Sequence, residues 1–279
     1  MNDMKKLKYQ LVAIDLDWTT LRSDKTIGPE TVRAVNEAMD LGCEVIFCTG
    51  RSRVQFEGYL EQFPKLRYAI ASSGAVVYDV ITWDKLVSNE LYPELVERIL
   101  RVGQPLDCFP FMAVDGKSIY SGPMAPLAVE YGLENYIYEM RNFATGVEDV
   151  FTWYQANPQP VESLALYFRD HSPCAGVRDA LQGLPLYLSF PKEPCVEISL
   201  DTADKGKALT SLCARLSIPM EQTMVIGDSD NDLPMFRAGG FAVAVDNAPP
   251  AVKAQAQAVT FDCDHDGVGA AIRKYLLET

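Results

Sequence analysis

The sequence predicts an α/β protein in which a doubly wound parallel sheet is interrupted by a second, α+β domain. Two observations carry this prediction. Short apolar runs alternate with amphipathic helical patterns up to residue 82 and again after residue 200, as in parallel βαβ units. Between these parts, apolar runs are instead joined by hairpin turns. We therefore expect a core of residues 1–82 and 200–279, with an inserted domain at 83–199.

Composition and charge restrict the class of protein. Of 279 residues, 48% are hydrophobic and 23% are charged, which is ordinary for one large or two moderate globular domains. The net charge of −13, with no cluster of Lys or Arg, argues against nucleic acid or an anionic membrane as a partner. A phosphorylated small molecule is compatible with this charge if the site brings its own local positive charge.

Two further features point to the cytoplasm. No uncharged apolar stretch approaches the roughly 20 residues that span a membrane, and the first apolar run is too short for a signal peptide. The seven cysteines include no Cys-x-x-Cys pair, and several lie inside apolar runs, where buried and unreactive thiols are the usual outcome. We therefore expect neither a disulfide framework nor a zinc site.

The first part of the core is expected to contain three buried strands joined by two helices. Apolar runs predict the strands at residues 11–14, 44–48 and 68–71. The first helix begins at Pro29, because proline suits the first helical position, and it ends before Gly42. The second helix covers about 52–63.

The insert and the second part of the core are predicted in the same way. In the insert, Asp115-Gly116 predicts a hairpin turn, and residues 140–162 are expected to be irregular. Its other expected elements are a helix around 95–100, strands at 108–114, 118–121, 164–168, 186–190 and 196–199, and a helix at 174–182. The parallel pattern then resumes with helices at 204–216, 233–236 and 267–277 and strands at 223–226 and 241–245.

Polar residues at the ends of the core strands form four motifs. These are Asp15-x-Asp17, Thr49-Gly50-Arg51, Lys205 at a helix start, and Gly-Asp-Ser-Asp-Asn-Asp at 227–232. Ligands of open α/β sheets bind beyond the carboxyl ends of the strands, so we expect the motifs to converge there. We expect the side chains of Asp15 and Asp17 to point to opposite sides of the strand axis.

Phosphoryl transfer through an aspartyl-phosphate is a chemistry that needs all four motifs. Asp15 is the candidate nucleophile, which splits one difficult step into two easier ones. A carboxylate that approaches a phosphate needs a cation, and Mg²⁺ prefers oxygen ligands such as those of Asp15 and Asp228. The candidate donors to the phosphoryl oxygens are the Lys205 ammonium, the Thr49 hydroxyl and the Gly50 N–H.

A general acid must also protonate the leaving oxygen and later take a proton from water, and Asp17 is the natural candidate. Asn231 and Asp232 are expected to bind phosphate or to orient metal-bound water. Each motif also has a simpler interpretation: Thr49-Gly50 as a plain turn, Lys205 as an exposed helix residue, and Asp204 or Asp228 as a helix cap. These interpretations do not explain why all four motifs occur in this order at strand ends and helix starts.

With these motifs, the sequence resembles the haloacid dehalogenase superfamily of phosphatases, specifically its Cof-like branch, along nearly the whole chain. The resemblance rests on Asp15-Leu-Asp17-Trp-Thr19, Thr49-Gly50-Arg51, Ser73-Gly74-Ala75, Asp204-Lys205-Gly206, Gly227-Asp228-Ser-Asp-Asn231-Asp232, Val245-Asp246-Asn247-Ala248 and Asp266-Gly267-Val268. It implies a Rossmann-like core, an α/β cap between the second and third motifs, Mg²⁺ dependence, and hydrolysis of small phosphorylated metabolites such as sugar phosphates.

The expected site residues follow from the motifs and the resemblance together. Asp15 and Asp17 are expected to be catalytic, and Asp15, Asp17 and Asp228 to lie at the metal. The residues expected at the phosphate are Thr49, Gly50, Lys205 and Asn231, with Asp232 supporting the metal ligands.

Two positions depart from the family pattern. Trp18 stands where the family usually has glycine, so it is strained if the position needs a positive φ and crowds the site if the position needs a small side chain. Ser73 stands where asparagine is common. In the insert, a further set of residues either lines a substrate pocket or, as we favour, belongs to the core of that domain. This set is Trp153, Tyr154, Tyr136, Tyr138 and Glu162.

Two other functions are compatible with the same motifs. A phosphotransferase or phosphomutase would pass the phosphoryl group from Asp15 to another alcohol. A non-catalytic metabolite-binding protein would have its site filled by Trp18. We prefer a phosphatase because every ionisable group that hydrolysis needs is present. Neither the substrate nor the oligomeric state follows from the sequence.

Overall fold

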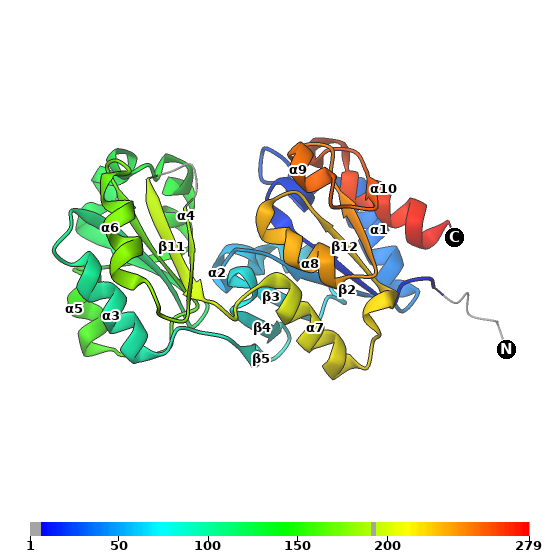
Figure 1. The fold of residues 1–279 in the computed structure, drawn as a ribbon. Helices are drawn as coiled ribbons and strands as arrows, with labels where there is room; N and C mark the ends of the chain where they lie inside the picture. Colours follow the sequence, from blue (N-terminus) through cyan, green and yellow to red (C-terminus); the bar gives the residue numbers. More distant parts are fainter. Residues whose placement is uncertain (1–6, 191–193, 279) are drawn as a thin grey trace. The chain divides into compact units, whose positions relative to one another are not determined.

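The computed structural model describes residues 7–190 and 194–278, and the chain forms two compact units (Figure 1). Unit 1 consists of Met1–Gly50, Tyr59–Ser88 and Asp204–Thr279, and unit 2 of Arg51–Gly58 and Asn89–Ala203. Unit 1 extends past the expected boundary at residue 82 because strand β5 (Asp84–Ser88) pairs with β4 (Val76–Asp79). The assignment of the two parts as catalytic core and specificity cap stays a prediction.

Unit 1 is built on an eight-stranded sheet in the order β14-β13-β12-β1-β2-β3-β4-β5. The strands not yet described are β1 (Leu11–Ile14), β2 (Glu44–Cys48), β3 (Tyr68–Ala71), β12 (Thr223–Gly227), β13 (Phe241–Ala244) and β14 (Ala258–Val259). All neighbours from β14 to β3 are parallel, whereas β4 and β5 are added antiparallel at one edge. The predicted α/β class is confirmed.

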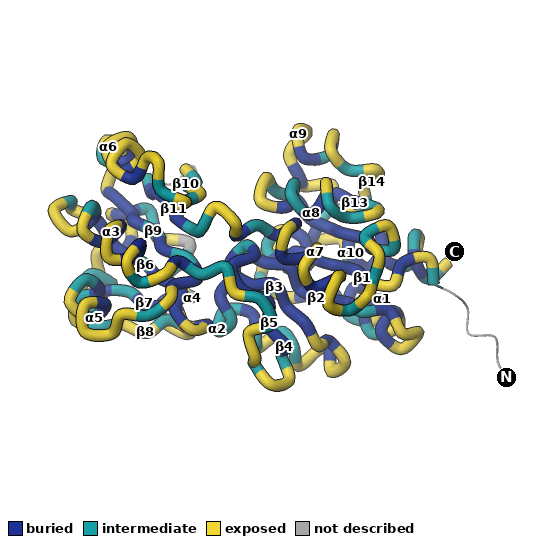
Figure 2. Tube along the Cα trace, turned by 60° about the horizontal axis from the view of Figure 1, so that its bottom comes forward, coloured by how far each residue is buried: buried dark blue, intermediate teal, exposed yellow. Residues whose placement is uncertain are grey.

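The central strands are buried on both faces, and their register brings their carboxyl ends together. Every residue of β1 and β12 is buried, as an apolar run between two layers of helices predicts (Figure 2). Ile14 at the end of β1 is opposite Ile226 on one side and Phe47 on the other. The loops that follow these three strands therefore start at the same edge of the sheet.

Helices lie on the two faces of this sheet (Figure 1). Buried side chains of α7 (Lys205–Leu216) and α8 (Leu233–Ala238) pack with Leu11, Ala13 and Ile46. Helix α1 (Pro29–Asp40) packs against α10 (Gly267–Ile272). The remaining helical segments of the unit are short: Leu16–Thr20, Ser72–Gly74, Met220–Gln222, Asp230–Asp232, α9 (Pro250–Lys253), Cys263–His265 and Arg273–Leu277.

The helix expected at about 52–63 is not one continuous α-helix. It is a single α-helical turn, α2 (Arg53–Phe56), followed by a 3₁₀-helix at Glu57–Gln62. A capping box at Ser52, in which the Gln55 side chain accepts from the Ser52 backbone N–H, explains why the helix begins at Arg53.

Unit 2 contains a six-stranded sheet in the order β10-β11-β9-β6-β7-β8. Its strands are β6 (Cys108–Val114), β7 (Lys117–Ser121), β8 (Ala144–Val147), β9 (Ser163–Phe168), β10 (Leu186–Ser189) and β11 (Cys195–Leu200). Every pair is antiparallel except β7 with β8, and Asp115-Gly116 connects β6 to β7 as a hairpin turn, as predicted. The α+β character of this part is thereby confirmed.

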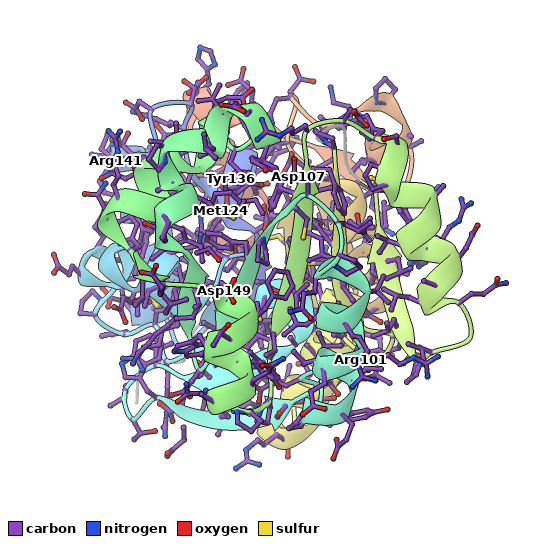
Figure 3. The ribbon with its side chains drawn as sticks, turned by 90° about the vertical axis from the view of Figure 1, so that its left-hand side faces the viewer. Arg101, Asp107, Met124, Tyr136, Arg141 and Asp149 are labelled. Carbon is purple, nitrogen blue, oxygen red and sulfur yellow. The ribbon has the colours of Figure 1, made fainter. Side chains whose placement is uncertain are left out.

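The helices of unit 2 are α3 (Pro93–Gly103), α4 (Ile137–Asn142), α5 (Val150–Ala156) and α6 (Ser172–Leu181), with 3₁₀ segments at Gly122–Tyr131 and Glu134–Tyr136. The prediction that 140–162 is irregular was wrong, because β8 and α5 lie within it. Asp149, labelled in Figure 3 at the start of α5, caps this helix by accepting a 2.7 Å hydrogen bond from the Thr152 N–H.

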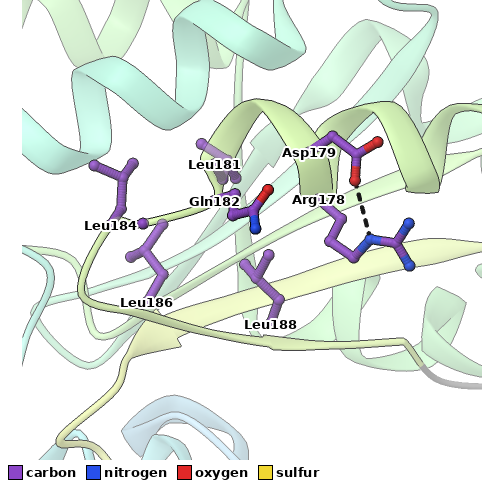
Figure 4. A pocket seen from close by; sticks show the side chains of 8 residues that line it. Arg178, Asp179, Leu181, Gln182, Leu184, Leu186 and Leu188 are labelled. Atoms are coloured by element: carbon purple, nitrogen blue, oxygen red, sulfur yellow. Dashed lines mark hydrogen bonds and ion pairs between the residues drawn. The ribbon is translucent and has the colours of Figure 1, made fainter.

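A small pocket of unit 2 lies between α6 and β10 (Figure 4). Leu181, Leu184, Leu186 and Leu188 line it, and Arg178 and Asp179 form an ion pair of 3.2 Å beside it. It contains none of the residues predicted for catalysis.

Within the described parts of the chain, no helix is both long enough and apolar enough to cross a membrane.

Candidate active site

The first motif begins where β1 ends. Asp15 follows the strand directly and is 5% exposed, and the chain then forms an irregular turn at Leu16–Thr20. The Thr20 hydroxyl donates a 2.5 Å hydrogen bond to the Asp15 carbonyl, which closes this turn on itself. The two carboxylates reach different partners: Asp15 contacts Lys205, and Asp17 contacts Lys25. The turn explains this difference, because on an extended strand two residues at this spacing would point to the same side.

Lys205 is the first residue of α7, and its side chain is completely buried. Its Nζ lies 2.6 Å from Asp15 Oδ1 and 2.6 Å from Asp232 Oδ1. The Asp204 carboxylate begins the helix by accepting a 2.7 Å hydrogen bond from the Lys207 N–H. The interpretation of Asp204 as a cap is therefore correct, whereas that of Lys205 as an exposed helix residue is wrong.

The loop after β12 brings two further carboxylates to the same place. Asp232 Oδ2 accepts hydrogen bonds from the N–H groups of Asp228 (2.9 Å) and Ser229 (3.0 Å). The Thr19 hydroxyl donates a 2.8 Å hydrogen bond to Asp228 Oδ1. Gly227 is required here, because a Cβ at this position would lie 2.5 Å from Asp232 Oδ2.

These carboxylates form a group that fits a divalent cation. Asp15, Asp228 and Asp232 each offer an oxygen, and these oxygens all lie within 4.8 Å of one another. A buried donor set made only of carboxylate oxygens suits a hard ion such as Mg²⁺. The group differs from the expected metal residues, since it includes Asp232 and does not include the Asp17 side chain.

Burial and mutual repulsion make this group hard to ionise fully. Burial, with Asp232 next to it, raises the pKa of Asp228 to about 7. Burial also raises the pKa of Asp15, although the Lys205 ammonium opposes this effect. Burial alone would lower the pKa of Lys205, but Asp15 and Asp232 outweigh it and raise that pKa, so the ammonium stays charged. One ammonium against three carboxylates leaves an excess of negative charge that a cation would balance.

The second motif lies where β2 ends. Thr49 is fully buried, and its carbonyl accepts a 3.0 Å hydrogen bond from the Ser73 N–H. A Cβ on Gly50 would lie 3.3 Å from Ser73 Oγ and 3.8 Å from Asn231 Nδ2, so three predicted motifs meet at this glycine. Gly74 has φ +100° and approaches α7 so closely that a Cβ there would lie 2.3 Å from the Asp204 carbonyl oxygen.

Asp17 and Trp18 lie at the surface beside the buried group. Asp17 Oδ1 is 3.1 Å from Lys25 Nζ, and the negative charge of Asp17 contributes to the raised pKa of Asp228. Trp18 adopts a left-handed conformation with φ +56°, so this position does need a positive φ and the tryptophan is strained there. Its side chain is 52% exposed, and its carbonyl accepts a 2.7 Å hydrogen bond from Asn247 Nδ2.

Two residues beside the site were not singled out from the sequence. Thr19 was noted only as part of a motif, yet its hydroxyl contacts Asp228. Lys25 belongs to none of the predicted motifs, yet it contacts Asp17. Neither contact has a local sequence signal, because the first depends on the pairing of β1 with β12 and the second on the fold of one turn.

The candidate pocket residues of unit 2 differ in their burial. Tyr154 is fully buried and donates a 2.6 Å hydrogen bond to the Gln159 carbonyl, and Trp153 packs against the same hydrophobic cluster. Glu162 is fully buried and accepts a 2.7 Å hydrogen bond from the Gly116 N–H. Tyr136 packs against a second cluster, whereas Tyr138 is 63% exposed. For all but Tyr138, the favoured interpretation as core residues agrees with these contacts.

Comparison with known proteins identifies the family of the chain. Residues 12–272 match the family model described as haloacid dehalogenase-like hydrolase. The chain belongs to this family, and the resemblance to its Cof-like branch is confirmed.

The relatives are phosphatases of nearly the same length. The chain is 30% identical over 290 residues to phosphatase YwpJ of Bacillus subtilis (strain 168), covering 96% of this chain and 100% of that protein. It is 24% identical to pyridoxal phosphate phosphatase YbhA of Escherichia coli (strain K12), covering 96% of this chain and 99% of that protein. A solved haloacid dehalogenase-like hydrolase from Bacteroides thetaiotaomicron superposes with a TM-score of 0.83 at 21% identity, covering 95% of this chain and 99% of that one. The protein is accordingly an enzyme of the phosphatase class.

Proposed function

We propose that this phosphatase is Mg²⁺-dependent and hydrolyses small phosphorylated metabolites through an aspartyl-phosphate formed on Asp15. The observation that carries the proposal is the buried contact of Lys205 with Asp15 and Asp232, next to Asp228. This contact holds together a carboxylate that can act as nucleophile, the Lys205 ammonium and a set of oxygen ligands. Nucleophilic catalysis at phosphorus requires these three components.

The metal-binding residues would be Asp15, Asp228 and Asp232. When bound, Mg²⁺ would supply positive charge that offsets the repulsion between the Asp15 carboxylate and the phosphate. Lys205 would remain beside Asp15 and donate to the transferring group. The Thr49 hydroxyl, the Gly50 N–H and Asn231 would donate to its other oxygens.

The reaction has two halves that balance. In the first, an oxygen of Asp15 forms a bond to phosphorus while the bond to the leaving alcohol oxygen breaks, and Asp17 gives that oxygen a proton. In the second, a water oxygen forms a bond to phosphorus, Asp17 takes the proton of this water, and the bond between Asp15 and phosphorus breaks. One ester and one water become one alcohol and one inorganic phosphate.

The substrate is expected among small metabolites with a single phosphate ester. The pyridoxal phosphate phosphatase among the relatives supports a panel that includes this compound alongside sugar phosphates and nucleotides. Trp18 lies half exposed beside the buried carboxylates, which favours a catalytic site over one filled by the indole. A sugar acceptor added to the assay distinguishes a hydrolase, which releases inorganic phosphate, from a phosphotransferase.

The test is phosphate release from this panel with Mg²⁺ and with EDTA, for the wild type and for Asp15→Asn. We expect release only with Mg²⁺, and a loss of at least about a thousandfold in Asp15→Asn. Asp40→Asn is the matched control, because Asp40 forms an exposed ion pair with Lys65 on the same unit. Rapid acid quenching followed by mass spectrometry should find phosphate on the peptide that contains Asp15. Substantial activity of Asp15→Asn would show that the nucleophile is another group.

A further inference from the structure

Asp17 is held by a neighbour that the family motifs do not include. The Nζ of Lys25 lies 3.1 Å from Asp17 Oδ1, and both side chains are partly buried, with 42% of the lysine and 37% of the aspartate exposed. The same ammonium lies 5.3 Å from the centre of the Trp18 ring, within range of a cation–π interaction. Lys25 thus contacts the proposed general acid and the strained tryptophan that follows it.

The turn that presents Lys25 is fixed from several sides. The Lys25 N–H donates to the Arg22 carbonyl (2.9 Å), and the Arg22 N–H donates to the Thr26 carbonyl (2.9 Å). Lys25 has φ +65°, a conformation that a lysine rarely adopts, and the Tyr59 hydroxyl donates to its carbonyl at 3.1 Å. These hydrogen bonds fix the backbone from which the Lys25 side chain extends toward Asp17.

The backbone of Trp18 is also held by a hydrogen bond, in this case from Asn247. Its carbonyl accepts from Asn247 Nδ2 at 2.7 Å, and Asn247 Oδ1 accepts from the Cys263 N–H at 2.9 Å. Two residues with positive φ, Trp18 and Lys25, therefore approach each other across Asp17. Strained conformations persist where the surrounding structure holds them, and they often occur at functional sites.

We propose that Trp18 and Lys25 form a clamp that orients the Asp17 carboxylate for proton transfer. This inference rests on the proposed role of Asp17 and adds two positioning residues to it. The ammonium binds Oδ1 and so holds the carboxylate in one orientation, and the indole lies beside the ammonium. The clamp also gives a reason for a tryptophan at a position with φ +56°, where glycine is the usual residue of the family.

The test compares kcat and KM of Lys25→Met with those of the wild type. Acid–base catalysis contributes a factor of about 10²–10⁴, so losing the orientation of Asp17 should lower kcat roughly tenfold and change KM less than about twofold. Lys25→Arg should restore kcat to within about threefold of the wild type. Lys65→Met is the matched control, because it breaks an exposed ion pair with Asp40 and should leave kcat unchanged.

Three further variants test whether Lys25 and Trp18 act through Asp17. In an Asp17→Asn background, Lys25→Met should have no additional effect on kcat, because the group that it positions is gone. Trp18→Phe keeps a ring beside the ammonium and should retain most of kcat, whereas Trp18→Gly should lower it about threefold. Trp83→Gly is the control, since Trp83 also has a positive φ of 61°. In the metal-free protein, Lys25→Met should change the tryptophan fluorescence, and this change should vanish when Trp18 is phenylalanine.

Four results would overturn the clamp: unchanged kcat in Lys25→Met, an equal loss in the Asp17→Asn background, a change confined to KM, or a rise in activity of Trp18→Gly. The last would mean that the indole obstructs the site. If the proposed function is wrong, the wild type releases no phosphate, and the clamp is then rejected together with that function. With an active wild type and an inactive Asp15→Asn, an unchanged Lys25→Met rejects the clamp alone.

Discussion

The hydroxyl of Thr19 donates a 2.8 Å hydrogen bond to Asp228 Oδ1, although the two residues are 209 positions apart in the chain. This contact joins the loop after β1 to the loop after β12, and it exists because the two strands are adjacent and parallel. It also lowers the pKa of Asp228, although burial and Asp232 have larger effects and raise that pKa. Thr19 therefore holds one of the proposed metal-binding carboxylates in place and favours its charged form.

Thr19→Val should destabilise the protein and weaken its response to Mg²⁺. Removing a buried hydroxyl that contacts a carboxylate lowers the free energy of unfolding by about 1–3 kcal/mol. Urea unfolding measures this loss, and the Mg²⁺ concentration for half-maximal activity should rise. Thr210→Val, which removes a hydroxyl that donates to the Gly206 carbonyl at 2.8 Å, should leave the Mg²⁺ dependence unchanged. An unaltered Mg²⁺ dependence in Thr19→Val would contradict the role given to this contact.

Lys205→Met should strongly destabilise the protein at neutral pH. It removes the buried cation that neutralises Asp15 and Asp232, and an uncompensated buried charge costs about 3–5 kcal/mol. The loss should be smaller at pH 5, where the carboxylates can take up protons, so unfolding is measured at both pH values. Lys207→Met is the control, because this lysine is exposed and its ion pair with Asp204 is 3.1 Å long. Equal losses for the two lysines would show that Lys205 has no special role in stability.

The stability of the metal-free protein should fall as the pH rises from about 5 to 8. Burial raises the pKa of Asp228 to about 7 in the folded protein, so the folded state holds a proton that the unfolded state has already lost. The stabilisation from this proton is present at low pH and disappears as the pH passes the folded pKa. Asp228→Asn, which cannot ionise, should flatten this part of the profile in thermal unfolding.

Mg²⁺ should therefore stabilise the protein more at pH 8 than at pH 5.5. The ion competes with protons for the same carboxylates, and a ligand at 100 times its Kd adds about 2.7 kcal/mol. The rise in Tm on adding Mg²⁺ measures this effect at each pH. A rise that is equal at both pH values would mean that the ion binds elsewhere than at Asp15, Asp228 and Asp232.

The sequence predicted the strands of the core and the convergence of its motifs because both depend on local patterns. Apolar runs identified β1, β2 and β12, and the polar residues after them had to meet at one edge of a parallel sheet. Asp232 was expected only to support the metal ligands. Its place beside Asp15 and Asp228 depends on how the loop after β12 folds back. In this loop, Asp232 Oδ2 accepts hydrogen bonds from the N–H groups of Asp228 and Ser229.

Other features could not be predicted, because they depend on packing or on single backbone angles. Residues 140–162 lack a long apolar pattern, yet β8 forms by pairing with β7, and α5 begins at a cap on Asp149. The positive φ of Trp18 is opposite to what a tryptophan indicates, and it depends on neighbours such as Asn247 that are distant in the sequence. The family resemblance indicated that the position of Trp18 could need a positive φ, whereas the local propensity of tryptophan does not predict one.

Two helical glycines should respond to alanine in opposite directions. Gly206, the second residue of α7, lets this helix approach α8 so closely that a Cβ would lie 2.3 Å from the Pro234 carbonyl oxygen. Gly206→Ala should therefore lower the free energy of unfolding by about 1–3 kcal/mol and displace Lys205, with a loss of phosphatase activity. In α6, a Cβ on Gly176 would meet nothing within 4 Å, so Gly176→Ala should stabilise by about 0.5–1 kcal/mol. Urea unfolding of both variants, with kcat measured alongside, checks the pair. If Gly206→Ala were as stable and as active as the wild type, the close approach of α7 to α8 would not be what positions Lys205.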